Sequence, residues 1–248
     1  QLFRAMGWKA PKYAHTAQLM KIDEQTGSKR KLSKRKDPEL ALTYYNQQGY
    51  PAPSVLEYLM TLLNSNFEEW RRANPDKPMS DFPFSTKKMS GSGALFDIDK
   101  LKDVSKNVIS RMPAEAVYDA VAAWSEKNDP AFHALFTREP DKTRAFLAIG
   151  RGGKKPRKDI ALWSDVKPYM DFLFDELFQP DYTLPEHVSK DDAKAILQEF
   201  KAQFDENDTP DGFFAKMKAI AVEHGFAAET KAYKQDPSQY KGHVGDVS

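Results

Sequence analysis

Cysteine is absent from the 248-residue sequence. Its absence excludes disulfides, thiolate zinc sites, iron–sulfur clusters and cysteine nucleophiles, and it fits a reducing compartment, so we expect a cytoplasmic protein. No apolar run approaches the roughly 20 residues that cross a bilayer, so we expect no membrane association. The segment Gln1–Trp8 has neither an initiator methionine nor the charged-then-apolar pattern of a signal peptide. It resembles the middle of a helix, and we interpret the chain as cut or processed.

An excess of one charge sign is also missing. There are 37 basic and 36 acidic residues, which gives a formal net charge of +1. The global charge therefore indicates neither a basic protein that binds nucleic acid nor an acidic protein. Only a local concentration of charge can support nucleic-acid binding. Hydrophobic residues make up 40% and aromatic residues 12% of the chain, which is enough to build packed cores and excludes a disordered tail.

The common catalytic and metal-binding motifs are lacking as well. The five histidines are scattered without paired metal spacing, so we expect no metal site, and no elbow-type serine motif is present. Gly91-Ser92-Gly93 begins like a dinucleotide fingerprint but lacks the third small residue. Gly150-Arg151-Gly152-Gly153-Lys154-Lys155-Pro156 resembles a phosphate loop only loosely. The sequence thus holds no self-contained catalytic constellation.

What the sequence does contain is helical periodicity. We predict a mainly α fold with one small β element between residues 80 and 98, a polar loop at 21–37 and a linker at 180–188. Ser54-x-x-Glu57 and Ser189-x-x-Asp192 read as capping boxes, and Thr209-Pro210 reads as an N-cap followed by proline. The predicted helices cover residues 54–70, 97–112, 113–124, 131–149 with a break near Pro140, 166–177, 189–204 and 209–225.

Basic residues gather in two loops. Six of the nine residues from Ser28 to Lys36 are Lys or Arg, and such a loop can present ammonium groups, a hydroxyl and backbone donors to a polyphosphate. Composition alone favours a solvated loop or a nuclear-localisation-like run. The second loop, Arg151 to Lys158, fits a solvated turn and contact with RNA phosphates equally well.

The order of residues in the first loop favours binding of a polyphosphate over a solvated loop. Lys31-Leu32-Ser33-Lys34-Arg35 resembles the second signature motif of class I aminoacyl-tRNA synthetases, in the form common to glutamyl enzymes. The stretch Gln1–His15 also resembles the segment that leads into that motif.

Two later segments extend the resemblance. Gly93-Ala94-Leu95-Phe96-Asp97 followed by Lys100-Leu101 resembles the stem-contact region of bacterial glutamyl-tRNA synthetases. Lys154 to Asp159 with Trp163-Ser164-Asp165-Val166 is similar to their helical anticodon-binding region. The resemblance therefore spans nearly the whole chain and keeps the order of the family.

This resemblance implies a parent enzyme that activates glutamate with ATP and Mg²⁺ and transfers it to tRNA. Lys31 and Lys34 would be catalytic and contact the ATP phosphates, with Ser33, backbone N–H groups and Arg35 assisting. The basic side chains of the second loop would bind tRNA; they are Arg151, Lys154, Lys155, Arg157 and Lys158.

The implied architecture is a stem-contact region with a small β element, followed by helical anticodon-binding domains. Residues 1–112 would end the catalytic region, residues 113–183 would form one helical subdomain and residues 184–248 a second, truncated one. The first signature of the class, His-x-Gly-His, is not found among the histidines. We therefore expect the nucleotide-binding fold to lie before Gln1 and the fragment, a monomer, to be inactive alone with no ATP bound.

Two alternatives remain. A free-standing tRNA-binding module is disfavoured by the signature loop, which is useful only next to a nucleotide fold. A fragment of a glutaminyl-type enzyme would carry β-barrel anticodon domains, and the helical periodicity after Pro113 argues against it. Whether the parent charges only tRNA for glutamate or also tRNA for glutamine stays open, as do the anticodon bases that it reads.

Overall fold

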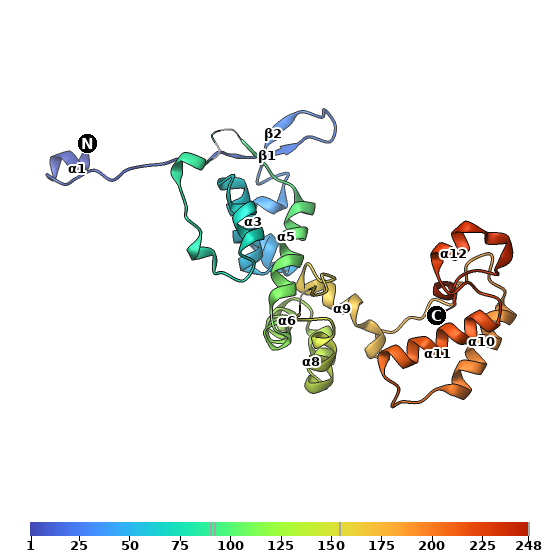
Figure 1. Ribbon diagram of the computed structural model, residues 1–248. Helices are drawn as coiled ribbons and strands as arrows, with labels where there is room; N and C mark the ends of the chain where they lie inside the picture. Colours follow the sequence, from blue (N-terminus) through green and yellow to red (C-terminus); the bar gives the residue numbers. More distant parts are fainter. Residues whose placement is uncertain (90, 92, 154, 248) are drawn as a thin grey trace. The chain divides into compact units, whose positions relative to one another are not determined.

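The computed structural model describes residues 1–89, 91, 93–153 and 155–247. The chain divides into two compact units, Gln1–Phe178 and Gln179–Ser248 (Figure 1). Its fold is mainly α with a small sheet, as the sequence predicts. The finer division after residues 112 and 183 stays a prediction. Among the described helices, none has the length and apolar character that a membrane span requires.

Within the described residues, the sheet of the first unit has three short strands in the order β2-β1-β3. Strand β1 (Leu19–Ile22) pairs antiparallel with β2 (Lys29–Lys31) and parallel with β3 (Ala94–Leu95). Strand β3 lies in the predicted β region, but the prediction of a polar loop at 21–37 is wrong. Asp23 accepts bonds from the backbone N–H groups of Gln25 and Thr26, and this local turn joins β1 to β2 as a hairpin.

Four helices follow the hairpin: α2 (Leu42–Gln48), α3 (Ala52–Leu63), α4 (Phe67–Ala73) and α5 (Ile98–Arg111). The prediction of one helix through residues 54–70 is wrong. Asn64 has an extended backbone, and its side chain donates to the Ser85 carbonyl at 3.1 Å and accepts from the Asn66 N–H at 3.2 Å. These bonds separate α3 from α4.

The predicted capping box at Ser54 is also wrong. Helix α3 begins at Ala52 after Pro51, so Ser54 lies inside its first turn. Ser54 is fully buried and accepts a 2.9 Å hydrogen bond from Ser105 of α5, which in turn also contacts the Ala161 carbonyl at 2.6 Å. The serine joins two helices and does not cap one.

The core around these elements brings the hairpin, α2, α3 and α5 together. The hydroxyl of fully buried Tyr58 accepts a hydrogen bond from the Asp97 N–H at 2.6 Å, which fixes α3 to the start of α5. The buried residues of this cluster are Leu32, Tyr45, Tyr50, Tyr58, Phe96, Leu101, Ala161 and Leu162.

The rest of the first unit contains α6 (Ala114–Asn128), α7 (Pro130–Phe136), α8 (Pro140–Ala148) and α9 (Val166–Tyr169). The predicted break near Pro140 is confirmed. The predicted helix over 166–177 is wrong, because Met170 leaves the helical conformation (φ −128°, ψ 17°) while fully buried in the core. Tertiary packing thus overrides the helical periodicity here. The core consists of Ile109, Val117, Tyr118, Val121, Phe132, Phe136, Leu147, Ile160, Trp163, Val166, Met170 and Phe174.

The second unit holds α10 (Lys190–Gln203), α11 (Pro210–Glu223) and α12 (Thr230–Gln235). The N-caps at Ser189 and Thr209 are confirmed, because their hydroxyls accept from backbone N–H groups in the first turns of α10 and α11. Only this half of the capping box predicted at Ser189 forms, because the Asp192 carboxylate accepts from the Ser189 hydroxyl and from Lys241. The core of this unit consists of Val188, Ala193, Ile196, Ile220, Ala221, Phe226 and Val244.

Single-turn elements complete the two units. Helix α1 spans Leu2–Ala5. The 3-10 turns lie at Pro38–Leu40, Met79–Asp81, Thr86–Lys88, Trp163–Asp165, Asp171–Leu173, Pro237–Gln239 and Val244–Asp246.

Candidate functional site

The first basic loop begins at the end of β2 and closes into a tight turn. The backbone N–H of Leu32 donates to the Leu19 carbonyl at 3.1 Å, which continues the hairpin pairing beyond Lys31. The N–H groups of Lys36 and Asp37 then both donate to the Ser33 carbonyl, at 3.0 and 2.8 Å. We call residues 33–37 the signature turn. Lys34 and Arg35 are exposed on it, and Leu32 is buried beneath it.

One carboxylate organises this turn from inside. Asp37 is only 2% exposed, and it accepts two hydrogen bonds from the guanidinium of Arg30, at 2.7 and 2.8 Å, and one from the Ser33 N–H at 2.7 Å. The hydrogen bond from Arg30 is the main reason that the pKa of Asp37 lies far below its usual range. Arg30 is therefore bound in an internal ion pair and differs from the other cations of the loop.

A second ion pair secures the segment that follows the turn. Lys21 of β1 contacts Glu39 at 2.7 Å, and the Glu39 carboxylate is nearly buried. The hydrogen bond to Glu39 raises the pKa of Lys21. The hydroxyl of Tyr45 donates to the Glu39 carbonyl, so the chain after the turn is held both to the sheet and to α2.

The outer side of the loop carries the free cations. Lys31, Lys34 and Arg35 are exposed, and within the described residues no ion pair engages them. The Ser33 side chain is partly exposed, whereas its backbone N–H is already bonded to Asp37. Lys31 at the end of β2, together with Lys34, Arg35 and the Ser33 hydroxyl on the signature turn, suits a polyphosphate such as that of ATP. In the part of the chain that the structure describes, no cluster of three His, Asp or Glu side chains could hold a metal ion.

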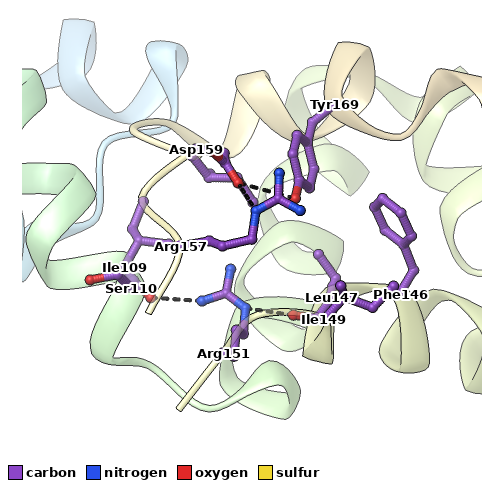
Figure 2. A pocket seen from close by; sticks show the side chains of 10 residues that line it. Ile109, Ser110, Phe146, Leu147, Ile149, Arg151, Arg157, Asp159 and Tyr169 are labelled. Carbon is purple, nitrogen blue, oxygen red and sulfur yellow. Dashed lines mark hydrogen bonds and ion pairs between the residues drawn. The ribbon is translucent and has the colours of Figure 1, made fainter. Parts of the chain in front are cut away.

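The second basic loop is anchored by Arg151, as Figure 2 shows. Its Nε donates to the Leu147 carbonyl at 2.6 Å and its Nη1 donates to the Ile109 carbonyl at 2.8 Å. These carbonyls belong to the last turns of α8 and α5, where a cation offsets the helix dipole. Burial lowers the pKa of Arg151, but its guanidinium remains charged. Arg151 therefore faces into the unit.

Arg157 closes the base of the same loop. Its N–H donates to the Gly150 carbonyl at 2.9 Å, and its guanidinium contacts the Asp159 carboxylate at 2.6 Å (Figure 2). Tyr169 also donates to Asp159, at 3.3 Å. Gly150 has φ of +70°, and a Cβ there would lie 2.4 Å from the Arg157 side chain, so both the backbone conformation and the close contact favour glycine. Lys155 and Lys158 are exposed, and Lys154 lies outside the described residues.

A cleft that the sequence does not reveal lies beside Lys158. It has a volume of about 410 Å³ and is bordered by α3, α4 and α5. On one side, nearly buried Glu57 contacts Arg71 at 2.9 Å and Arg111 at 3.2 Å. Sequence reasoning assigned Glu57 to a cap. A signal for the cleft was nevertheless present in the sequence. The spacing of Lys100 and Arg111 places both residues on the same side of α5.

Comparison with known proteins extends the match across the whole chain. The glutamate–tRNA ligase of Acetivibrio thermocellus is 50% identical over 248 residues, which is 100% of this chain and 45% of that protein. The glutamate–tRNA ligase of Sorangium cellulosum is 44% identical over 262 residues, covering 100% of this chain and 46% of the relative. The chain thus spans about half the length of the curated relatives that it matches. No protein-family model matches it.

The fold agrees with solved structures as well. A crystal structure of a glutamate tRNA ligase from Elizabethkingia meningosepticum, in complex with its amino acid, matches with a TM-score of 0.60 at 17% identity, covering 100% of this chain and 50% of that chain. The glutamate–tRNA synthetase of Elizabethkingia anophelis matches with a TM-score of 0.51 at 19% identity, over 99% of this chain and 49% of that one. The chain belongs to the glutamate–tRNA ligase family and corresponds to the C-terminal part of its bacterial members.

Proposed function

We propose that this chain is the tRNA-binding part of an enzyme that attaches glutamate to tRNA with ATP and Mg²⁺. The support is the similarity of the whole chain to about half the length of glutamate–tRNA ligases, together with two exposed basic loops in a mainly helical fold. By the same resemblance, the protein would act as a cytoplasmic monomer. Residues 1–112 would be the end of the catalytic region, with the signature loop and the stem-contact fold. Residues 113–183 and 184–248 would be two helical anticodon-binding subdomains.

The observation that carries the proposal is the signature turn with its exposed cations. In this proposal Lys31 and Lys34 contact the ATP phosphates, and Arg35 and the Ser33 hydroxyl assist. Charge builds up on phosphate oxygens during adenylate formation, so fixed cations stabilise the transition state more than the ground state. The resemblance assigns adenine and glutamate recognition to a part outside this chain, and we therefore expect the chain alone to be inactive.

The experiment is Lys34→Ala in a longer ligase that contains this sequence, assayed by ATP–pyrophosphate exchange. We expect kcat to fall about 10- to 100-fold with a smaller change in KM for ATP. Lys36→Ala is the matched control, because Lys36 is an exposed cation of the same turn outside the signature. A raised KM with unchanged kcat would contradict the assignment. Exchange by the isolated chain would contradict its predicted inactivity.

For the second loop we propose two kinds of contribution to tRNA binding. Lys155 and Lys158, with Lys154, contact backbone phosphates directly. Arg151 and Arg157 spend their hydrogen bonds on the base of the loop and hold the lysines in place. Neutralising the lysines should lower tRNA affinity and flatten its dependence on salt concentration, whereas an unchanged salt slope would assign this loop to solvent.

A further inference from the structure

We propose that Arg30 and Asp37 are positioning residues for phosphate binding, and that their buried ion pair holds the signature turn in its working shape. We call this pair the Arg30–Asp37 latch. The inference rests on the proposed function of the turn and adds residues that the signature motif does not contain. Neither residue is assigned to touch ATP.

The latch controls both ends of the turn through one carboxylate. Asp37 is the last residue of the turn, and its carboxylate accepts the backbone N–H of the first, Ser33, at 2.7 Å. The same carboxylate accepts two parallel bonds from Arg30 at 2.7 and 2.8 Å, and the Lys21 ammonium lies 4.0 Å from it. Such a bidentate pair fixes distance and orientation together. The turn that carries Lys34 and Arg35 is therefore held closed by the side chain of Arg30, which belongs to β2.

Strand geometry separates the latch from the cations that face outward. Successive side chains of a strand point to opposite faces, so Arg30 lies opposite Lys29 and Lys31. Lys29 and Lys31 are exposed, whereas the Arg30 side chain is only 28% exposed. Arg30 also contacts Asp23 in the hairpin turn at 3.1 Å. One guanidinium thus bridges the two turns that bound β2, while its neighbours remain available to a ligand.

Because Asp37 is buried, its charge depends on the partners that the latch supplies. Asp37 is 2% exposed, so its charge is poorly solvated without Arg30 and the Ser33 N–H. Asparagine at position 37 would offer one acceptor oxygen to the three donors that now bond the carboxylate, and it would place an NH2 group against them, so the turn would lose part of its support. Because a displacement of about 1 Å in a catalytic group can lower a rate about 100-fold, release of the turn should affect turnover more than ATP binding.

The test is Asp37→Asn in a longer ligase that contains this sequence. Asparagine is nearly isosteric but lacks the charge. We expect kcat for ATP–pyrophosphate exchange to fall at least tenfold with KM for ATP changed less than threefold, and Asp37→Glu to restore part of kcat. Asp23→Asn is the matched control, since it removes the other ion pair of Arg30 but keeps the Oδ1 that accepts from the Gln25 and Thr26 N–H groups, and it lies outside the signature turn. It should change kcat less than twofold.

A structural role alone would give a different result. If Asp37→Asn lowers the melting temperature but leaves kcat and KM unchanged in the folded protein, the positioning role is overturned. Arg30→Lys keeps the charge but not the bidentate pair, so it covers the case in which Asp37→Asn does not fold. It should lower kcat at least threefold, and a folded Arg30→Lys protein with normal kcat would equally overturn the proposal.

Hydrogen exchange gives an independent readout in this chain. The Ser33 amide should lose at least tenfold in protection in Asp37→Asn and none in Asp23→Asn, and equal protection in all three proteins would refute the latch. Lys34→Ala separates this inference from the proposed function. If Lys34→Ala leaves exchange activity unchanged, the phosphate-binding function fails; if it lowers activity while Asp37→Asn does not, only the latch fails.

Discussion

Replacing Arg151 with methionine should destabilise the Gln1–Phe178 unit by about 2–4 kcal/mol. The guanidinium makes two short hydrogen bonds, to the carbonyls of Ile109 and Leu147. Each such bond of a partly exposed charged donor contributes about 1–1.5 kcal/mol, and the favourable position at two helix ends adds about 0.3–1 kcal/mol. Methionine keeps a long, flexible side chain in the same place, so the change mainly removes these polar contacts.

Equilibrium urea unfolding followed by tryptophan fluorescence measures this effect. All four tryptophans, at positions 8, 70, 124 and 163, lie in the first unit. The signal therefore reports on the unit that contains Arg151. Lys155→Met is the matched control in the same loop, because Lys155 is exposed and should change stability by less than about 0.5 kcal/mol.

The same variant distinguishes an anchor from an RNA contact. If Arg151 is an anchor, the Arg151→Met protein is less stable to urea than the wild type. If Arg151 instead contacts a phosphate, the slope of log affinity for tRNA against log salt is smaller by about 0.7–0.9 in Arg151→Met, and the stability changes little. If Arg151→Met unfolds at the wild-type urea concentration and shows the smaller salt slope, our reasoning about the inward position of Arg151 is refuted.

Three further predictions concern other parts of the chain. Changing Lys155 or Lys158 to glutamine should reduce the tRNA salt slope by roughly 0.7–0.9 each in a filter-binding assay. Ser189→Ala removes the N-cap of α10 and should cost about 1 kcal/mol, measured by urea unfolding followed by far-UV circular dichroism. The pKa of Asp37 is lowered on folding, so its stabilisation is complete above the unfolded pKa near ~4 and is lost as pH falls toward the folded value. Melting temperatures between pH 5 and pH 2 should therefore decline less steeply in Asp37→Asn than in the wild type, and parallel declines would show that Asp37 contributes nothing.

Helix positions were predictable wherever a local signal decides them. Ser189 and Thr209 cap helices because the backbone donors that they satisfy lie within three residues. Ser54 begins the same kind of pattern but lies inside α3, since its partner is Ser105, 51 residues away. Here the capping pattern does not mark the start of a helix, because the hydroxyl forms its hydrogen bond with a residue far away in the sequence. The sequence contains no local mark of that contact.

The hairpin was missed for a related reason. Strand β1 shows no clean alternation, because Leu19, Met20 and Lys21 are all partly buried. What sets the pairing is the turn at Asp23, whose carboxylate accepts two backbone N–H groups, and Gly27, whose φ is +66°. A polar turn of this kind looks like a solvated loop in composition. The same short segment supplies the strand from which the signature turn is held.

The site itself was predictable as a run of cations but not as an arrangement of them. Counting Lys and Arg treats Arg30 and Lys34 alike, yet one is bound to a buried carboxylate and the other is exposed. The available signal was Asp37, an acid that directly follows a run of basic residues and can reach back to Ser33 across a turn. In the second loop Asp159 also pairs with Arg157, but both side chains are exposed, and the inward-facing cation is Arg151, which backbone carbonyls hold. An acidic residue at the end of a basic loop therefore indicates a cation that is already paired, whereas Arg151 shows that a cation without an acidic partner can still be held by backbone carbonyls.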